Sequence, residues 1–226
     1  MKGPRVWGGG LDGSLGRYTG PMFTGLIEYC GRVVSRSAVP AGERLVVDVA
    51  GWGVVPRYGD SIAVQGCCLT VAEEPRAGVE RLAFDVVPET LSKTTLGGLG
   101  PGSRVHLEAS ATLATLLGGH LVQGHVDGVG RVERIWTEGE WRVRVRPPSE
   151  LMQYMTPKGS ISVEGVSLTL AAVSPEEGWF ELALIPTTLA KTTLGALKVG
   201  DGVNLECDAI GKTVVHWLRH YGGNRG

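Results

Sequence analysis

Cysteine is scarce in this chain, which has only four (Cys30, Cys67, Cys68 and Cys207) among 226 residues. No Cys-x-x-Cys pair and no zinc-type spacing of histidines occurs, so the sequence indicates neither a disulfide scaffold nor a metal centre. We therefore expect a reduced, cytoplasmic protein that binds no metal.

A charge excess and long apolar runs are also missing. The 22 basic and 23 acidic residues give a formal net charge of −1, whereas nucleic-acid binding needs a concentrated positive surface. No stretch approaches the roughly 18 apolar residues of a membrane span, and no apolar run of signal-peptide length follows the N-terminus. We expect neither nucleic acid nor membrane as a partner.

Phosphate-binding and nucleophile motifs are absent as well. The chain has no GxxxxGK[ST] loop, no GxGxxG after a strand and no GxSxG elbow. What it has is glycine, 35 residues, with many short β-type segments between turn signals. This pattern is typical of small antiparallel barrels.

The most informative feature is an internal repeat. Residues 24–33 align with 123–132, residues 61–70 with 160–169 (6 of 10 identical), and residues 88–108 with 186–206 (13 of 21 identical). The offsets are 99, 99 and 98 residues. Two copies of this length indicate two copies of one small domain rather than a solenoid.

The repeat sets the expected domains. Residues 1–21 lack periodicity, and we expect a disordered extension with Met22 as the true start. A first barrel is expected over 22–119, a second over 120–209, and a helix over 210–226. Within each barrel, the proline-led segments at Pro88 and Pro186 predict short helices, and residues 111–117 predict a further helical turn.

Several segments together resemble the riboflavin synthase family of the lumazine-dismutating type. They are MFTGLIE (from Met22), GDSIAVQGCCLTV (Gly59), VPETLSKTTLG (Val87), GGHLVQGHVDGVG (Gly118), KGSISVEGVSLTL (Lys158), IPTTLAKTTLG (Ile185) and NLECDAIGK (Asn204). The resemblance covers the chain from about Met22 to Leu218.

The resemblance implies an all-β fold of two homologous six-stranded antiparallel β-barrels in tandem plus a C-terminal α-helix, in a homotrimer. It implies a transferase that converts two molecules of 6,7-dimethyl-8-ribityllumazine into riboflavin and 5-amino-6-(D-ribitylamino)uracil by moving a four-carbon unit. No cofactor is used, and an association with lumazine synthase is a further partner that the resemblance admits.

The resemblance also assigns site residues. The catalytic candidates are Ser167, His125, Asp208, Cys68 and Phe23, with Ser167 or a neighbouring water as the nucleophile, His125 as its proton relay and Phe23 as a cover. Substrate contacts are expected from Gly25, Leu26, Ile27, Cys68, Leu69, Thr70, Asp85, Val86, Val87, Pro88, Glu89 and Thr90 in the first barrel. In the second they are expected from Gly124, His125, Val126, Lys158, Ser167, Leu168, Thr169, Ala183, Leu184, Ile185, Pro186, Thr187 and Thr188.

Three alternatives stay open. His120 is either a structural residue or a functional one. The apolar stripe of Ile210, Val214, Trp217, Leu218 and Tyr221 either packs on its own barrel or joins subunits. The chain itself is either the enzyme or a non-catalytic lumazine- or flavin-binding protein of the same fold.

Overall fold

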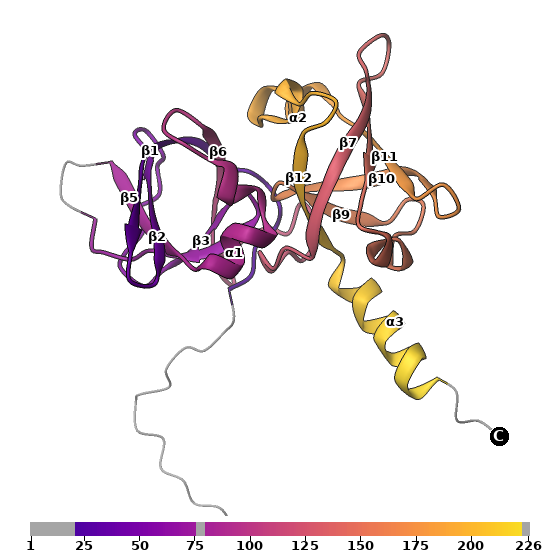
Figure 1. The fold of residues 1–226 in the computed structure, drawn as a ribbon, viewed down its shortest axis with the longest axis horizontal. Coiled ribbons are helices and arrows are strands. Elements are labelled where there is room, and N and C mark those ends of the chain that lie inside the picture. Colours follow the sequence, from indigo (N-terminus) through magenta and orange to yellow (C-terminus); the bar gives the residue numbers. More distant parts are fainter. Residues whose placement is uncertain (1–20, 76–79, 223–226) are drawn as a thin grey trace, which may run out of the picture.

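The computed structural model describes residues 21–75 and 80–222 as two antiparallel β-domains and a C-terminal helix (Figure 1). The first domain contains β1 (Tyr29–Val39), β2 (Gly42–Asp48), β3 (Ser61–Val64), β4 (Cys67–Thr70), β5 (Arg81–Val86) and β6 (Arg104–Ala109). The second contains β7 (Gly128–Trp136), β8 (Arg142–Arg146), β9 (Ser160–Val163), β10 (Val166–Ser174), β11 (Trp179–Ala183) and β12 (Gly202–Cys207). The expected extension over 1–21 lies outside the described residues, apart from Pro21.

The two domains share one strand order. The second is a closed barrel in the order β10-β11-β8-β7-β12-β9, and the first is a six-stranded sheet in the order β4-β3-β6-β1-β2-β5. The edges of that sheet meet just past β4, where Val71 forms a bridge with Phe84. The predicted all-β architecture of two six-stranded units is confirmed.

Alternation of apolar and polar residues builds these strands. Leu45 and Val47 in β2, and Val143 and Val145 in β8, are buried between more exposed neighbours, as expected for a sheet with one face on a core. Each domain has its own core, centred on Val47, Phe84 and Leu107 in the first and on Val145 and Phe180 in the second.

Short helices follow β5 and β11 in both copies. They are α1 (Pro88–Lys93) and α2 (Pro186–Lys191), each with proline in its first turn, where its missing N–H costs nothing. Single 3-10 turns, η1 (Thr95–Gly98) and η3 (Leu194–Ala196), come next, and η2 (Ser149–Tyr154) precedes β9. The helical turn predicted over 111–117 is wrong, because the segment contains only one tight turn.

The last helix, α3 (Ala209–Tyr221), begins where β12 ends. The Asp208 carboxylate caps it by accepting the Ile210 N–H at 2.9 Å. Figure 1 shows α3 running outward from the second barrel, in yellow. All its side chains remain at least partly exposed, including the predicted apolar stripe. Among the described residues, no helix has the length and apolar character that a membrane crossing requires.

The two domains meet through a buried polar cluster. Asn204 on β12 accepts the Thr95 N–H at 2.7 Å and donates to the Gln65 carbonyl at 2.9 Å. At the equivalent place of the other copy, His106 on β6 accepts the Thr193 N–H at 2.8 Å. The interface is therefore nearly two-fold symmetric, with asparagine on one side and histidine on the other.

Candidate functional site

The site is built around two short loops, one ahead of each barrel, which we call the straps: residues 24–28 and residues 123–127. A buried glutamate fixes each strap. The carboxylate of Glu108 accepts the backbone N–H groups of Thr24 (2.6 Å) and Gly25 (3.0 Å). A carboxylate suits this task because its two oxygens accept several hydrogen bonds at once.

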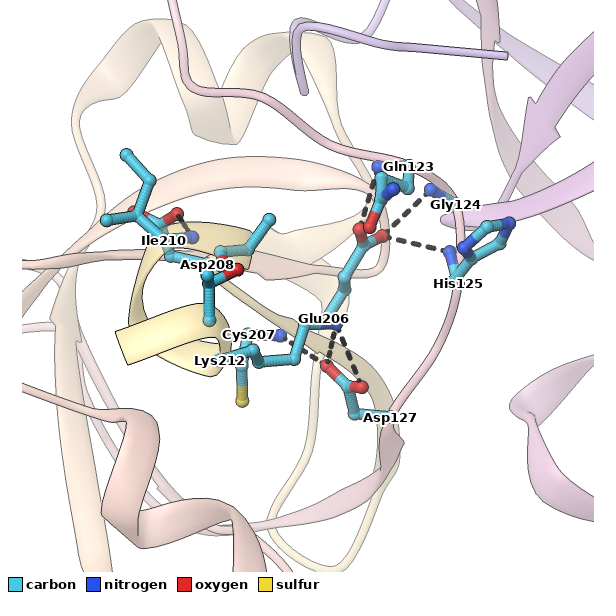
Figure 2. A network of polar contacts seen from close by, with 11 residues as sticks. Gln123, Gly124, His125, Asp127, Glu206, Cys207, Asp208, Ile210 and Lys212 are labelled. Carbon is cyan, nitrogen blue, oxygen red and sulfur yellow. Dashed lines mark hydrogen bonds and ion pairs between the residues drawn. The ribbon is translucent and has the colours of Figure 1, made fainter. Parts of the chain in front are cut away.

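Glu206 plays the same part for the second strap. It accepts the N–H groups of Gln123 (2.7 Å), Gly124 (2.9 Å) and His125 (3.2 Å), as Figure 2 shows. Burial raises the pKa of Glu206 to about 7, while the strap N–H groups and Lys212 act to lower that pKa. The buried Glu206 carboxyl therefore holds the backbone of residues 123–125 in position.

Each strap then docks on the opposite barrel. The Ser167 N–H donates to the Gly25 carbonyl, and the Cys68 N–H donates to the Gly124 carbonyl, both at 2.8 Å. The strap glycine is required at this approach: Gly124 has φ +75°, and a Cβ there would lie 2.7 Å from the Cβ of Cys68. Each copy therefore places its strap against the other copy's fourth-strand position.

The 123–127 strap closes a cavity of about 310 Å³ on the first barrel. Its lining residues are Cys67, Cys68, Glu89, Thr90, Lys93, Thr94, Gly124, His125 and Val126. Six of these nine belong to the predicted set. Burial raises the pKa of the Cys68 thiol, so Cys68 enters the cavity as a neutral thiol rather than a reactive thiolate.

A second cluster forms at Ser167, where the 24–28 strap docks. The Ser167 hydroxyl lies 2.6 Å from Nδ1 of His120. Burial lowers the pKa of His120, and the nearby charge of Asp208 acts to raise it. Within the described chain the Ser167 hydroxyl contacts His120, whereas His125 lines the Cys68 cavity, so the relay between Ser167 and His125 stays a prediction.

Part of the third predicted segment of the second barrel lines another cavity. Ala183, Leu184, Ile185 and Pro186 line a cavity of about 530 Å³ together with Thr137, Gly139, Glu140, Trp141 and Leu189. The indole Nε1 of Trp141 is buried there without a hydrogen-bond partner among the described residues. Comparison of the two copies in the sequence does not identify Trp141 as a cavity residue.

Other predicted residues have different surroundings. Phe23 is fully buried between the domains and packs with Ala63 and Val122 against Cys68, so it supports the cavity wall and does not cover an opening. The Asp85 carboxylate pairs with Arg44 at 2.7 Å, which holds its pKa low. Lys158 is exposed in the turn before β9.

Comparison with known proteins identifies the same two copies. The lumazine binding domain model matches residues 24–110 and 123–208. Riboflavin synthase of Mycobacterium bovis is 44% identical over 203 residues, covering 89% of this chain and 100% of the relative. This chain belongs to the riboflavin synthase family. The Bacillus subtilis riboflavin synthase is 35% identical over 207 residues, covering 90% of this chain and 93% of the relative.

The crystal structure of LumP complexed with riboflavin also resembles this riboflavin synthase family member. It has a TM-score of 0.72 and 25% identity, covering 82% of this chain and 98% of that one. Besides Phe23, two residues near the site lie outside the matched lumazine-binding segments: His120, between the two segments, and Lys212, in α3. Neither has a counterpart in the repeat, so comparison of the two copies could not find them.

Proposed function

We propose that this chain is a transferase that makes riboflavin from two molecules of 6,7-dimethyl-8-ribityllumazine. One molecule gives up a four-carbon unit and leaves as 5-amino-6-(D-ribitylamino)uracil, and the other gains that unit and becomes riboflavin. The two products contain every atom of the two substrates, so no further reactant is needed. The curated relatives named riboflavin synthase support this assignment.

The observation that carries the proposal is the paired construction of the site. Two straps of equivalent position dock on opposite barrels, which suits a reaction between two copies of one ligand. The side chains beside the two docking points differ: Cys68 and His125 at one, Ser167 and His120 at the other. That difference suits a reaction in which one copy donates and the other accepts.

The Ser167–His120 pair supplies proton transfer in this proposal. Because burial lowers the pKa of His120, its imidazole is neutral at neutral pH. A neutral Nδ1 accepts the Ser167 proton and raises the nucleophilicity of the hydroxyl, or of a water beside it, toward C7 of the acceptor lumazine. Asp208 stabilises the imidazolium that results.

The remaining rate enhancement comes from positioning. The C7 methyl group of the lumazine is acidic because its anion is delocalised over the ring, so the substrate brings much of its own reactivity. Holding two such rings face to face is worth roughly 7–11 kcal/mol. The backbone N–H and C=O groups of the straps are rigid enough for that task because Glu108 and Glu206 anchor them.

Assembly and location belong to the same proposal. We propose a homotrimer whose subunits join through the exposed stripe of α3, with the working site between the first barrel of one subunit and the second barrel of its neighbour. We place the enzyme in the cytoplasm, which fits its four free thiols. An association with lumazine synthase, which would deliver the substrate, completes the proposed partners.

One assay tests the function. The purified full-length chain is incubated with 6,7-dimethyl-8-ribityllumazine, and both products are separated by chromatography. We expect riboflavin and the pyrimidine product in a 1:1 ratio, with two lumazines consumed. Tight binding of lumazine or riboflavin with no turnover would instead identify a non-catalytic binding protein of this fold.

A further inference from the structure

The second strap is tied to helix α3 by an ion pair. Nζ of Lys212 lies 3.0 Å from both carboxylate oxygens of Asp127, the last residue of the strap. Asp127 also accepts the Cys207 N–H at 2.7 Å. Both side chains are mostly withdrawn from solvent, with 25% of Lys212 and 21% of Asp127 exposed. Such partial burial strengthens an ion pair relative to one on an open surface.

The strap is consequently fixed at both of its ends. Glu206 holds the N–H groups of residues 123–125, and Lys212 holds the carboxylate of Asp127, as Figure 2 shows. His125, the last residue that Glu206 holds, lies two positions before Asp127 and lines the Cys68 cavity. A shift of α3 that moves Lys212 is therefore transmitted to His125 through Asp127 and Val126.

The first copy has no such connection to a helix. Glu28 occupies the place of Asp127, and its carboxylate accepts the Ala109 N–H at 3.3 Å and the Trp52 indole N–H at 3.2 Å. Between Ser110 and the start of β7, the chain contains a turn and no helix. Residues 24–28 therefore provide an internal control for any effect on residues 123–127.

We propose that Lys212 is a positioning residue that couples the seating of α3 to the cavity through Asp127 and the strap carrying His125. This rests on the proposed function for the identity of the ligand, and on the geometry alone for the coupling. The helix proposed to join subunits thereby sets the shape of the first-barrel cavity, so the cavity is fully formed only when α3 is in place.

The coupling is tested first without any ligand. In the full-length chain, Lys212→Met removes the charge and keeps most of the side-chain volume, and Lys198→Met makes the same change at an exposed loop lysine. Backbone hydrogen exchange is followed by mass spectrometry. We expect exchange about fivefold faster in residues 123–127 for Lys212→Met only, as loss of roughly one partly buried ion pair implies. Residues 24–28 remain unchanged.

Ligand and turnover measurements complete the test. Lys212→Met is expected to weaken lumazine binding or lower turnover about fivefold, with Lys212→Arg recovering most of the loss. Asp127→Asn, which still accepts the Cys207 N–H, should give the same effect, and the double variant should be no worse than either single one.

Equal acceleration of exchange in both straps, or none in residues 123–127, overturns the coupling. A wild-type chain that makes no riboflavin overturns the proposed function instead, while the exchange pattern still decides the role of Lys212.

Discussion

Cys68 and Ser167 show what two copies of one sequence can do at the scale of single residues. They stand at equivalent positions, each below a strap carbonyl from the other half. A thiol is a weak hydrogen-bonding group, whereas a hydroxyl next to an imidazole takes part in proton transfer. The same backbone geometry therefore presents a thiol in one half and a hydroxyl paired with an imidazole in the other, and we propose that only the second is reactive.

This contrast predicts opposite kinetic effects. Ser167→Ala and His120→Asn are expected to lower turnover by about 100- to 10,000-fold, the usual value of acid–base assistance. Cys68→Ala is expected to weaken lumazine binding by roughly fivefold, about 1 kcal/mol, with turnover retained. Single-turnover kinetics beside ligand titration measure both.

A Ser167→Ala, His120→Asn double variant should lose no more than either single one, because the pair acts as a unit. The reverse order, with Cys68→Ala slowing turnover most, would exchange the donor and acceptor assignments. Small and equal effects at all three positions would leave catalysis to positioning by the backbone.

Glu164 is a buried carboxyl whose charge state affects stability. It is fully buried at the domain interface and accepts the Asn204 N–H at 2.5 Å, and burial raises its pKa to about 7. The equivalent residue of the other copy, Gln65, accepts the His106 N–H at 2.9 Å with an uncharged amide. An uncharged glutamine side chain thus already makes the equivalent hydrogen bond in the other copy.

Glu164→Gln is therefore expected to stabilise the chain at alkaline pH. A carboxyl with a raised pKa contributes stability that is full below its ordinary pKa of 4.5 and is lost as pH rises through 7. Above pH 7 the variant should gain about 1–3 kcal/mol over wild type, with little difference near pH 4.5. Urea unfolding at both pH values measures this, and a variant less stable at pH 8 would contradict it.

Sequence alone identifies equivalent residues but not all partners. The pairing of Cys68 with Ser167, and of Gln65 with Glu164, follows from the repeat. The contact of Ser167 with His120 could not be predicted, because His120 lies in the linker between copies and reaches Ser167 across 47 residues of sequence. His125, the histidine that the resemblance assigns to the relay, lies at the Cys68 cavity instead.

At the scale of elements, α3 stands out because none of its side chains is fully buried within the described chain. Val214 and Trp217 are 50% and 52% exposed on the same side of the helix. Exposing apolar surface to water costs roughly 25 cal/mol per Å² of that surface. Covering the stripe with a partner surface would therefore be strongly stabilising.

We expect Val214→Glu with Trp217→Glu to yield monomers by sedimentation and to abolish riboflavin formation, while lumazine binding remains. Arg219→Glu, on the opposite face of the helix, is the control and should leave assembly intact. A trimer that survives the double substitution would show that the stripe serves another purpose.

Element prediction succeeded where a local rule was sufficient. Alternation identified the strands, proline marked the starts of α1 and α2, and 3.6-residue spacing identified α3. It failed over 111–117, where leucines and alanines suggested a helical turn. Several of those leucines are exposed, so no packing stabilises a helix there, and propensity alone is too weak over so short a segment.

At the scale of the whole molecule, the two domains depend on reciprocal polar contacts. The Nδ1–H of His106 donates to the Glu164 carbonyl at 2.8 Å, which leaves Nε2 to accept the Thr193 N–H. Asn204 makes the matching pair of contacts with one amide group. Asparagine therefore already makes the equivalent pair of contacts at the matching position of the other copy.

His106→Asn is expected to cost less than about 1 kcal/mol of folding free energy, because its amide reproduces both contacts. His106→Leu should cost about 2–4 kcal/mol, because it leaves a buried N–H and a buried carbonyl unpaired. Denaturant unfolding compares the two. Equal losses would mean that the imidazole ring is needed for its shape.

The reciprocal docking of the straps also indicates how the two-domain chain arose. Gly25 docks at Ser167 and Gly124 docks at Cys68, which is the reciprocal pattern of an isologous dimer. A one-barrel chain could make both contacts only by pairing with a second copy of itself. Joining two such genes end to end would preserve every contact and free each half to change separately. The two halves now differ at His120, at Lys212 and in the Gln65–Glu164 pair, as such divergence predicts. A relative with a single barrel that forms a dimer through the same contacts would represent the state before the genes were joined.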